Sequence, residues 1–543
     1  MSTQADIGTA NAAVSSVVDH IFSHHPHVAR RAGSHEFDGV LPEVGPHPVG
    51  ALDDLLATAR AELAALPATA DPELRADLDA AVHVLGSERF PAAALGRAWP
   101  GPLTWLGATD VPGLPDAGHP SLVDRMAALR AQLAGLPRFL EQAAGTVADR
   151  LPAGERLIGI EYARAQAARL EDVGRVVARD HSGYAEDGIA VAAAEAAAAC
   201  RRYAEAVAAA EPANLLYGPE LLDEFLQVTQ GVDQQAEELL DHAETEVAAL
   251  VARLDALAAR LGVSGRGEAF DLLRAEVSAA PVPDVLTATI ARLREFWARA
   301  DVVSVDTATP LEVRRAPRLT GAARVEFSIS PPLARDRAPH VLWVPEPDSG
   351  HGDVRVRFLN DPMLEVIAVH EAVPGHYVQI EAVTRGPSVL RACVPWFPAF
   401  TEGWGHYVEE LAIERGLAEG RPLVEVAQLR SALEATTRLL VFLAVHMGRT
   451  SFGASVTRAM ALCGWSAERA AREVVIVAAD PGGAMYALGK SRIRAWRREV
   501  GTGRPALKEF HDRLVACGNV PLSTALRYYR DGLAHTDDTD TGS

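Results

Sequence analysis

The segment LEVIAVHEAVPGHYVQIEAV, residues 364–383, decides how the rest of the chain is interpreted. Its pattern is apolar and helical, and it carries His370, Glu371 and His376. A helix can present two imidazoles to one zinc ion when the histidines are about four residues apart, with a glutamate between them that activates water. Here the interval is six residues (376 − 370 = 6). A regular helix of about 3.6 residues per turn would carry the two histidines to different faces.

Pro374 and Gly375 lie between the two histidines and predict an interruption of the helix. Pro374 has no N–H to donate to the carbonyl of His370, and Gly375 tolerates almost any backbone angle. An unwound or bulged turn would bring His376 back toward His370, and such turns are frequent at functional sites. In a protein without a metal site, the same pair more often marks the end of a helix. The segment alone leaves both interpretations open.

A third ligand is available in PAFTEGWGHYVEELAIERG, residues 398–416. Glu402 follows His376 by 26 residues (402 − 376 = 26) within a second predicted helix, so two neighbouring helices would converge on one ion. His406 lies one turn beyond Glu402, where we expect it to orient the carboxylate. Taken alone, Glu402 could equally be an acidic residue that interacts with its helix dipole. Together with the first segment, the metal interpretation is favoured.

Upstream of these helices, residues 303–358 alternate apolar with polar side chains in runs bounded by Pro, Gly and Asp. This pattern predicts a small antiparallel β-sheet beside the metal-site helix. The runs are VVSVDTATP (302–310), ARVEFSISPP (323–332), HVLWVPEP (340–347) and DVRVRFLND (353–361). An edge of such a sheet could pair with an extended substrate by adding a strand.

The remainder of the chain is predicted to be helical, which makes the fold class mainly α. Residues 46–300 are rich in Ala, Leu, Glu and Arg, and helical patterns return after Pro362. One apolar stripe recurs every three or four residues and ends at Gly262. Its members are Leu240, Ala243, Val247, Leu250, Leu254, Leu257 and Leu261. We expect an N-terminal segment (1–45), a helical N-terminal region (46–300), a region with the two motif helices (301–535) and a disordered tail (536–543).

Composition restricts the partners and the compartment. The 543 residues include 72 acidic and 52 basic side chains, a net charge of −20 that would repel nucleic acid or an anionic membrane. The four cysteines form no CxxC pair, and no apolar run approaches the roughly 20 residues of a membrane span. The N-terminus has no basic region followed by an apolar stretch. We therefore expect a cytoplasmic protein that binds neither nucleic acid nor membrane.

Four histidines near the N-terminus, His20, His24, His25 and His27, suggest a second metal site. They have no carboxylate or thiol partner at a regular spacing, and we interpret them as surface residues. The chain also has no GxxxxGK[ST] phosphate loop and no GxSxG elbow, so nucleotide hydrolysis and serine hydrolysis have no support.

Over nearly its whole length, the chain resembles domain-of-unknown-function family 885, whose members are regarded as zinc peptidases of the gluzincin type. The resemblance rests on HEAVPGHYVQ (370–379) and on FTEGWGHYVEEL (400–411), which is similar to the family's Glu-Gly-Trp-x-x-Tyr-x-Glu element. Further similar segments follow in family order. They are AGSHEFD (32–38), TRLLVFLAVH (437–446), GWSAERA (464–470), MYALGKSRIRAWR (485–497) and LKEFHDRLVACGNVPL (507–522).

The resemblance implies a large, helical, zincin-like body akin to thimet oligopeptidase and carboxypeptidase Taq, with one Zn²⁺ per chain. By that resemblance His370, His376 and Glu402 are the ligands and Glu371 is the general base. His406 and Tyr407 would support the ligands from behind. Zn²⁺ held by two imidazoles and one carboxylate keeps a position for water, lowers the pKa of that water to about 7, and leaves Glu371 to take its proton.

Later segments offer groups that could contact a substrate. Tyr486 and His446 are candidates for stabilising a tetrahedral oxyanion, since a well-placed donor is worth roughly 3 to 4 kcal/mol in comparable sites. A tyrosine packed in the core and a histidine satisfied by a carbonyl are the alternatives for these two residues. Lys490 or Arg492 could bind a substrate carboxylate, although a solvated helix face is the commoner explanation of such a charge run.

Several positions depart from the family pattern around the ligand set. Phe442 and Ala444 stand where the family has Asp and Gly, and a glycine replaces Gln ahead of Tyr486 in PGGAMY. His406 replaces a Leu of the Glu-Gly-Trp helix. The ligand set itself is intact, which favours an inherited metal site with a changed substrate.

Three functions are consistent with these observations. The first is a zinc-dependent hydrolase that cleaves an amide bond in a short peptide or an amino-acid-derived substrate. The second is a metal-dependent biosynthetic or catabolic enzyme that acts on a small non-peptide metabolite. The third is a helical binding protein without catalytic activity, which the intact His, Glu, His and Glu set disfavours. The sequence does not predict the oligomeric state.

Overall fold

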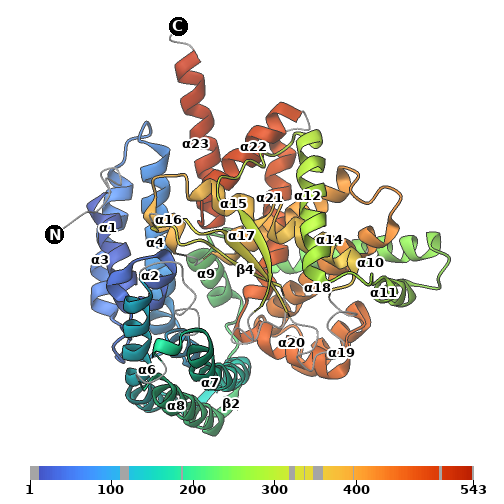
Figure 1. Cartoon of the computed structure of the whole chain (residues 1–543). Helices are drawn as coiled ribbons and strands as arrows, with labels where there is room; N and C mark the ends of the chain where they lie inside the picture. Colours follow the sequence, from blue (N-terminus) through green and yellow to red (C-terminus); the bar gives the residue numbers. More distant parts are fainter. Residues whose placement is uncertain are drawn as a thin grey trace.

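Most of the chain is helical, as its Ala-, Leu- and Glu-rich composition predicts. The computed structural model describes residues 11–110, 121–184, 188–316, 325–334, 337–345, 359–394, 397–500 and 504–540. In Figure 1 the N-terminal helices, coloured blue to teal, lie on one side, and the C-terminal helices, coloured orange to red, lie on the other. The helices α15 (His376–Val383) and α17 (Pro398–Glu414) lie between these two groups.

The helices before the three-stranded sheet follow the amphipathic pattern, with proline or a capping side chain at several N-termini. At the first of them, the Asn11 side chain accepts hydrogen bonds from the N–H groups of Ala13 and Val14. These helices are α1 (Ala12–His24), α2 (Pro26–Ala32), η1 (His35–Phe37), α3 (Val49–Ala65), α4 (Pro72–Ala93), α5 (Pro102–Gly107), α6 (Leu122–Ala144), α7 (Ala153–Asp180), η3 (Ser182–Tyr184), α8 (Ile189–Ala209), α9 (Pro219–Gln230), α10 (Ala236–Arg260), α11 (Arg266–Ala275) and α12 (Val282–Ala300).

The helices after the sheet carry the two motif segments and their supports. Besides α15 and α17 they are α14 (Asp361–Glu371), α16 (Val389–Cys393), α18 (Pro422–His446), α19 (Phe452–Cys463), α20 (Ala467–Ala479), α21 (Gly482–Val500), α22 (Arg504–Ala516) and α23 (Leu522–Asp540). The predicted apolar stripe lies on α10, where its members up to Leu257 are buried and the helix packs against α18. Gly262 follows with a φ of +79°, a left-handed conformation that favours glycine after a helix end.

The described residues form two hydrophobic cores. The larger core joins residues from all three predicted regions, among them Ile21, Leu250 and Phe400. The second core lies between α5, α6, α7 and α8 and contains Leu133 and Leu170. Composition identifies helices, but the packing of their faces decides which of them share a core.

The sheet beside the motif helices is mixed, which corrects the prediction of an antiparallel sheet. Its order is β3 (Leu311–Arg315), β5 (His340–Val344) and β4 (Glu326–Ser328), with β5 parallel to β3 and antiparallel to β4. The strand order differs from the chain order, and alternation within each run carries no information about strand direction. A separate pair, β1 (Arg150–Pro152) and β2 (Glu211–Ala213), was not predicted.

Two of the four predicted strand runs have a different outcome. Most of 353–361 lies outside the described residues. The run 302–310 is not a strand, because side chains from elsewhere take its backbone groups. Asp512 accepts the N–H of Ser304 at 2.6 Å, and Glu381 accepts the N–H groups of Ala308 and Thr309 at 2.6 and 3.0 Å.

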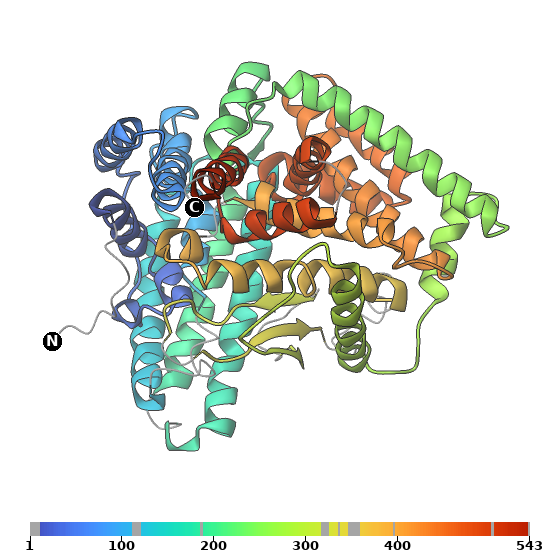
Figure 2. The ribbon, with the colours of Figure 1, turned by 90° about the horizontal axis from the view of Figure 1, so that it is seen from above.

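Glu381 fastens α15 to the sheet and to the loop before β3. Its other oxygen accepts from Nε2 of His340 at 3.0 Å, and Nδ1 of His340 accepts the N–H of Ser330. Burial alone would raise the pKa of Glu381, but hydrogen bonds from Thr309, His340 and Ala308 outweigh it and lower the pKa to about 2. Figure 2 shows the strands beside the α14–α15 pair.

We expect Glu381→Gln to destabilise the protein at pH 7 by roughly 2 kcal/mol, because hydrogen bonds to a buried carboxylate are lost. The folded pKa lies below the ordinary 4.5, so the stabilisation is complete above that pH and decreases as the pH falls toward 2. Thermal unfolding measured between pH 7 and 3 should therefore show the difference between variant and wild type shrinking in acid. Glu295→Gln, at a side chain that is 78% exposed, is the control and should match the wild type.

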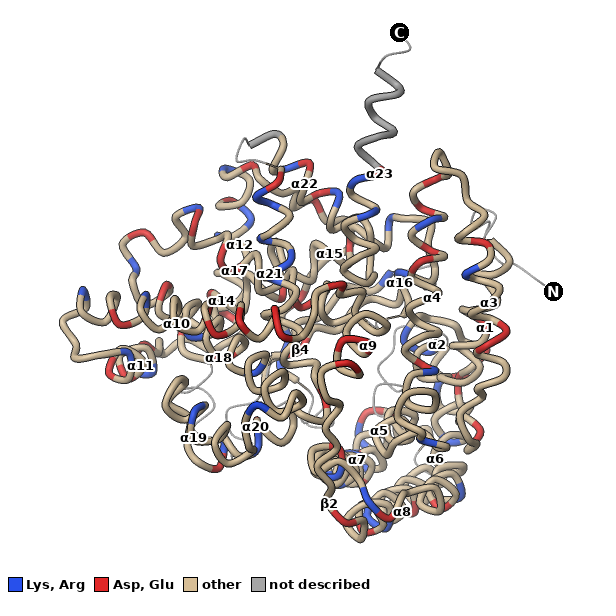
Figure 3. The backbone as a smooth tube through the Cα atoms, turned by 180° about the vertical axis from the view of Figure 1, so that it is seen from behind, with Lys and Arg blue, Asp and Glu red and all other residues tan. Residues whose placement is uncertain are grey.

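At the C-terminus, the backbone of α23 continues through Asp540, and the disorder expected from 536 stays a prediction. The helix begins at a docked segment in which Leu522 and Ala525 are buried, and extending a formed helix costs less than starting one. Figure 3 shows acidic and basic residues interspersed along the elements. Among the described residues, no helix combines the length and apolar character that crossing a bilayer requires.

Candidate metal centre

The chain between His370 and His376 is interrupted, as Pro374 and Gly375 predicted. The helix α14 ends at Glu371, and α15 begins at His376. A Cβ at Gly375 would lie 1.7 Å from the carbonyl oxygen of His370, so only glycine allows the backbone to turn this tightly. The interruption places the imidazole rings of His370 and His376 with centroids 4.7 Å apart and nearly perpendicular.

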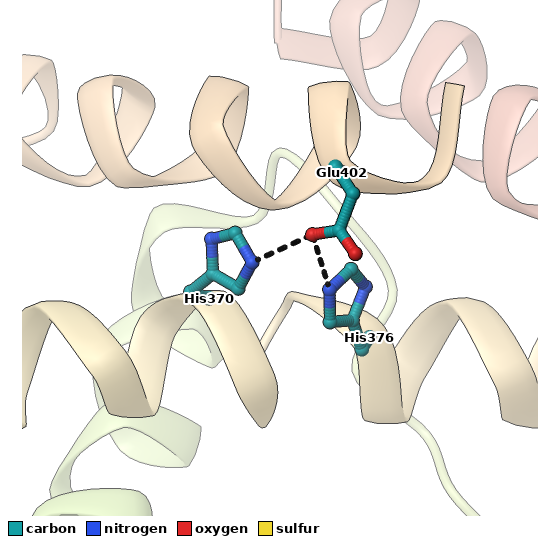
Figure 4. A group of neighbouring side chains, drawn as sticks. All are labelled: His370, His376 and Glu402. Carbon is teal, nitrogen blue, oxygen red and sulfur yellow. Dashed lines mark hydrogen bonds and ion pairs between the residues drawn. The ribbon is translucent and has the colours of Figure 1, made fainter. Parts of the chain in front are cut away.

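Glu402 on α17 completes a group of three that converge on one point (Figure 4). Its Oε2 lies 3.4 Å from Nε2 of His370 and 3.3 Å from Nε2 of His376, and all three ligand atoms lie within 4.8 Å of one another. At these separations His370, His376 and Glu402 could hold one ion together. The donor set of two imidazoles and one carboxylate is that of a catalytic zinc site.

The close approach of α17 to His370 depends on Gly405. A Cβ at Gly405 would lie 2.5 Å from Cε1 of His370, and one at Gly403 would lie 2.5 Å from Cα of Gly489 on α21. The indole N–H of Trp404 donates to the carbonyl of Pro374 at 3.0 Å and ties α17 to the interrupted turn. Gly405 therefore allows α17 to approach His370 closely, and Gly403 allows it to approach α21.

We expect Gly405→Ala to weaken zinc binding by about 10–100-fold, because the new methyl group displaces the imidazole of His370. Alanine is the better helix former, so helix propensity alone predicts no loss. Zinc affinity measured by competition with a chromogenic chelator checks this expectation. Gly453→Ala on α19, where a Cβ meets nothing within 4 Å, is the matched control and should bind zinc as the wild type does.

Glu409, which the sequence interpretation did not select, holds the back of His370. Its Oε1 accepts a hydrogen bond from Nδ1 of His370 at 2.8 Å, and the Glu409 side chain is buried. This bond orients the ring so that Nε2 faces Glu402. Glu409 lies seven residues after Glu402, two turns along the same helix face, and it is the last Glu of the Glu-Gly-Trp-x-x-Tyr-x-Glu element. That spacing was the signal that could have found it.

The charges of this group reinforce one another. Burial alone would lower the pKa of His370, but hydrogen bonds to Glu402 and Glu409 outweigh it and raise the pKa well above 6.5. Burial alone would raise the pKa of Glu402, but the neighbouring His376 and His370 lower it well below 4.5. These opposite shifts show that the imidazoles and the carboxylate interact directly.

Glu371 and Tyr486 lie next to the three ligand residues. Glu371 is the last residue of α14 and is half-buried, and its charge contributes to the raised pKa of His370. Within the described part of the chain, no hydrogen bond or ion pair engages its carboxylate. The ring of Tyr486 on α21 stacks on that of His370, with centroids 6.0 Å apart and planes 16° apart.

Residues 26–527 match the family "Bacterial protein of unknown function (DUF885)". The chain belongs to this family. Among solved structures, the DUF885 chain is similar to a "putative lipoprotein of unknown function" from Shewanella oneidensis, with 17% identity and a TM-score of 0.73 over 96% of this chain and 99% of that one. It is also similar to a "putative lipoprotein" from Colwellia psychrerythraea, with 16% identity and a TM-score of 0.74 over 96% and 98%. No curated protein matches. These structures share the fold.

His446 does not have the geometry of an oxyanion donor. This finding corrects the prediction that His446 stabilises a tetrahedral oxyanion. Its Nδ1 accepts the N–H of Tyr217 at 3.2 Å, and its Nε2 donates to the carbonyl of Ala478 at 2.9 Å. Both ring nitrogens are used by backbone groups, so no N–H remains for a substrate. The ring of Phe442 packs against that of His446, with centroids 4.9 Å apart.

Tyr407 and His406 also have partners other than the predicted ones. The buried hydroxyl of Tyr407 lies 2.7 Å from Nε2 of His511, and Nδ1 of His511 donates to the carbonyl of Val302. Tyr407 therefore contacts another part of the core and not the ligands. His406 is buried beside Glu409, with its Nδ1 3.6 Å from Oε2, and does not bond to Glu402. Side chains one turn apart share a helix face, but these two rotamers point elsewhere.

The two residues predicted to bind a substrate carboxylate, Lys490 and Arg492, have different surroundings. Lys490 is 2% exposed, and its Nζ lies 3.2 Å from Glu410 and 3.8 Å from Glu246, so two carboxylates of the protein already neutralise it. This geometry removes Lys490 as a substrate anchor. Arg492 is half-buried, makes no ion pair among the described residues, and stays a prediction.

The N-terminal histidines are less exposed than expected for surface residues. Only His24 is exposed, while His20, His25 and His27 are half-buried. His25 lies 3.1 Å from Glu88, and burial lowers the pKa of His27 to about 3.

Proposed function

We propose that this DUF885 protein is a zinc-dependent hydrolase that cleaves an amide bond in a short peptide or an amino-acid-derived substrate. The observation that carries the proposal is the convergence of His370, His376 and Glu402 beside Glu371. The resemblance of the HEAVPGHYVQ segment to family 885, whose members are regarded as zinc peptidases of the gluzincin type, supports it. The donor set fits zinc in number, chemistry and separation.

When bound there, Zn²⁺ supplies Lewis-acid activation of water and of the substrate carbonyl. The residues of the chain do the rest. Glu371, whose carboxylate is not engaged within the described chain, accepts the proton of the attacking water and passes it to the leaving amine. Tyr486 lies against His370, and its phenol is the group of this chain proposed to donate to the developing oxyanion.

The altered surroundings favour a second candidate, a metal-dependent enzyme that acts on a small non-peptide metabolite. Phe442 belongs to an aromatic group with Phe225, Tyr217 and His446, where the family pattern has a carboxylate. An apolar ring in place of a carboxylate changes which substrate groups could pack beside this position. The catalytic set would be the same for both candidates.

The test is the zinc content of the purified protein, followed by a peptide-library screen with the zinc-loaded sample. Cleavage of amide bonds that chelator removes and zinc restores would support the hydrolase. A zinc-loaded sample that cleaves no peptide would favour the small-metabolite enzyme. A protein that binds no zinc would overturn both candidates and return the helical binding protein as the better explanation.

We also propose a cytoplasmic, reducing location. The four cysteines are all buried and unpaired, which supports a compartment where thiols stay reduced. Cell fractionation tests this proposal, and recovery with the envelope would contradict it.

A further inference from the structure

A cavity of about 230 Å³ lies between α3, α4 and α9, and it shares no lining residue with the proposed metal centre. The helix α4 packs against both α3 and α9, so the cavity lies over α4 with the other two helices as its walls. The residues of α3 that line it recur every three or four positions and therefore form one face of that helix. They are Asp53, Leu56, Ala57 and Arg60. A cavity of about 150 Å³ can hold benzene, so this one has room for a larger small molecule.

The middle of this cavity is apolar. Leu56 and Phe90 are buried, and Val228 of α9 lines the same space. A Cβ at Gly86 would lie 2.9 Å from Cγ1 of Val228, so glycine allows α9 to come this close to α4. Apolar walls of this kind favour a ligand with small apolar groups along its length.

Two charged residues of the walls have no counter-charge from the protein. Asp53 and Arg89 neutralise each other in an ion pair. Arg60 on α3 and Glu224 on α9 also line the cavity, and among the described residues neither forms a hydrogen bond or an ion pair. A free cation on one wall and a free anion on the other complement a ligand that carries both charges.

Arg60 and Glu224 lie toward opposite ends of the cavity. Phe225, the neighbour of Glu224, packs its ring against that of Phe90, with centroids 5.6 Å apart. Phe90 follows Arg89, whose ion-pair partner on α3 lies seven residues before Arg60 (60 − 53 = 7). At 1.5 Å per residue, these seven residues correspond to about 10 Å along the helix. Three residues of extended peptide also span about 10 Å.

We propose that this cavity binds a short peptide of about three residues with free ends, its carboxylate against Arg60 and its ammonium group against Glu224. Small apolar side chains of the peptide pack against Leu56, Phe90 and Val228. No bond is made or broken at this site, which serves recognition alone. The inference does not depend on the proposed metal centre, and either can fail without the other.

The experiment is isothermal titration calorimetry of the full chain with trialanine, after chelator has stripped any metal and has been dialysed away. We expect saturable binding of trialanine and at least about 10-fold weaker binding of N-acetyl-trialanine amide, which lacks both end charges. Arg60→Gln and Glu224→Gln should each weaken the binding of trialanine by about 10-fold, because each removes one charge-assisted contact. Both side chains are exposed, so both variants should fold, which circular dichroism checks.

Two control variants should bind trialanine as the wild type does. Arg299→Gln changes a side chain on α12 that is 71% exposed, and Glu402→Ala removes a ligand of the proposed metal centre. Loss of binding in Glu402→Ala would overturn the inference, because the peptide would then occupy the metal centre. No saturable binding, equal binding of the blocked peptide, or unchanged binding in either cavity variant would also overturn it.

Discussion

Glu371→Gln is expected to lower the turnover of the reconstituted enzyme by about 10²–10⁴-fold while leaving its zinc content unchanged. The amide of glutamine has nearly the shape of the carboxylate but cannot accept a proton. Glu371 lies at the end of α14 and is not one of the three converging ligands, so the ion is expected to stay. The measurement is kcat on a substrate from the peptide screen, paired with metal analysis of the same sample.

The control for this prediction is Glu419→Gln, which changes an exposed glutamate beyond the end of α17. It should have the zinc content and the turnover of the wild type. If Glu371→Gln retained full turnover with zinc bound, Glu371 would not be the base, and the proposed mechanism would be wrong. If the variant lost its zinc, the residue would have a structural role at the site instead.

Glu402→Ala is expected to lose about one zinc ion per chain and all activity, because it removes one of three protein ligands. The Glu402 side chain is 26% exposed, so the substitution opens no cavity in the core and the protein should fold. Chelator should lower the melting temperature of the wild type, since an ion at about 100 times its Kd stabilises a fold by about 2.7 kcal/mol. We expect a markedly smaller shift in the variant.

His446→Gln serves as the contrasting variant for this experiment. His446 bonds to backbone groups of Tyr217 and Ala478, so its loss should reduce stability without reducing zinc content. Equal zinc content in wild type and Glu402→Ala would show that the ion lies elsewhere, and the proposed centre would have to be abandoned.

The local features of the site could be predicted because they depend on neighbouring residues. A proline has no N–H at any position, and a glycine allows a turn that a Cβ would block. Pro374 and Gly375 therefore predict the interruption between His370 and His376. The periodic apolar stripe of α10 likewise requires only its own sequence. Strand direction in the sheet was not predictable, because alternation is the same in parallel and antiparallel strands.

The sequence by itself therefore determined the mainly helical fold, the break in the motif helix and the residue types that can hold a metal ion. Only the tertiary structure decided which side chains support the three candidate ligands. Glu409, rather than His406 or Tyr407, accepts the hydrogen bond that supports His370. The ring of His446 bonds to backbone groups. The reason is physical: residue type and spacing fix which chemistry is available, whereas a hydrogen bond between distant segments exists only where helix packing brings the two groups within about 3 Å.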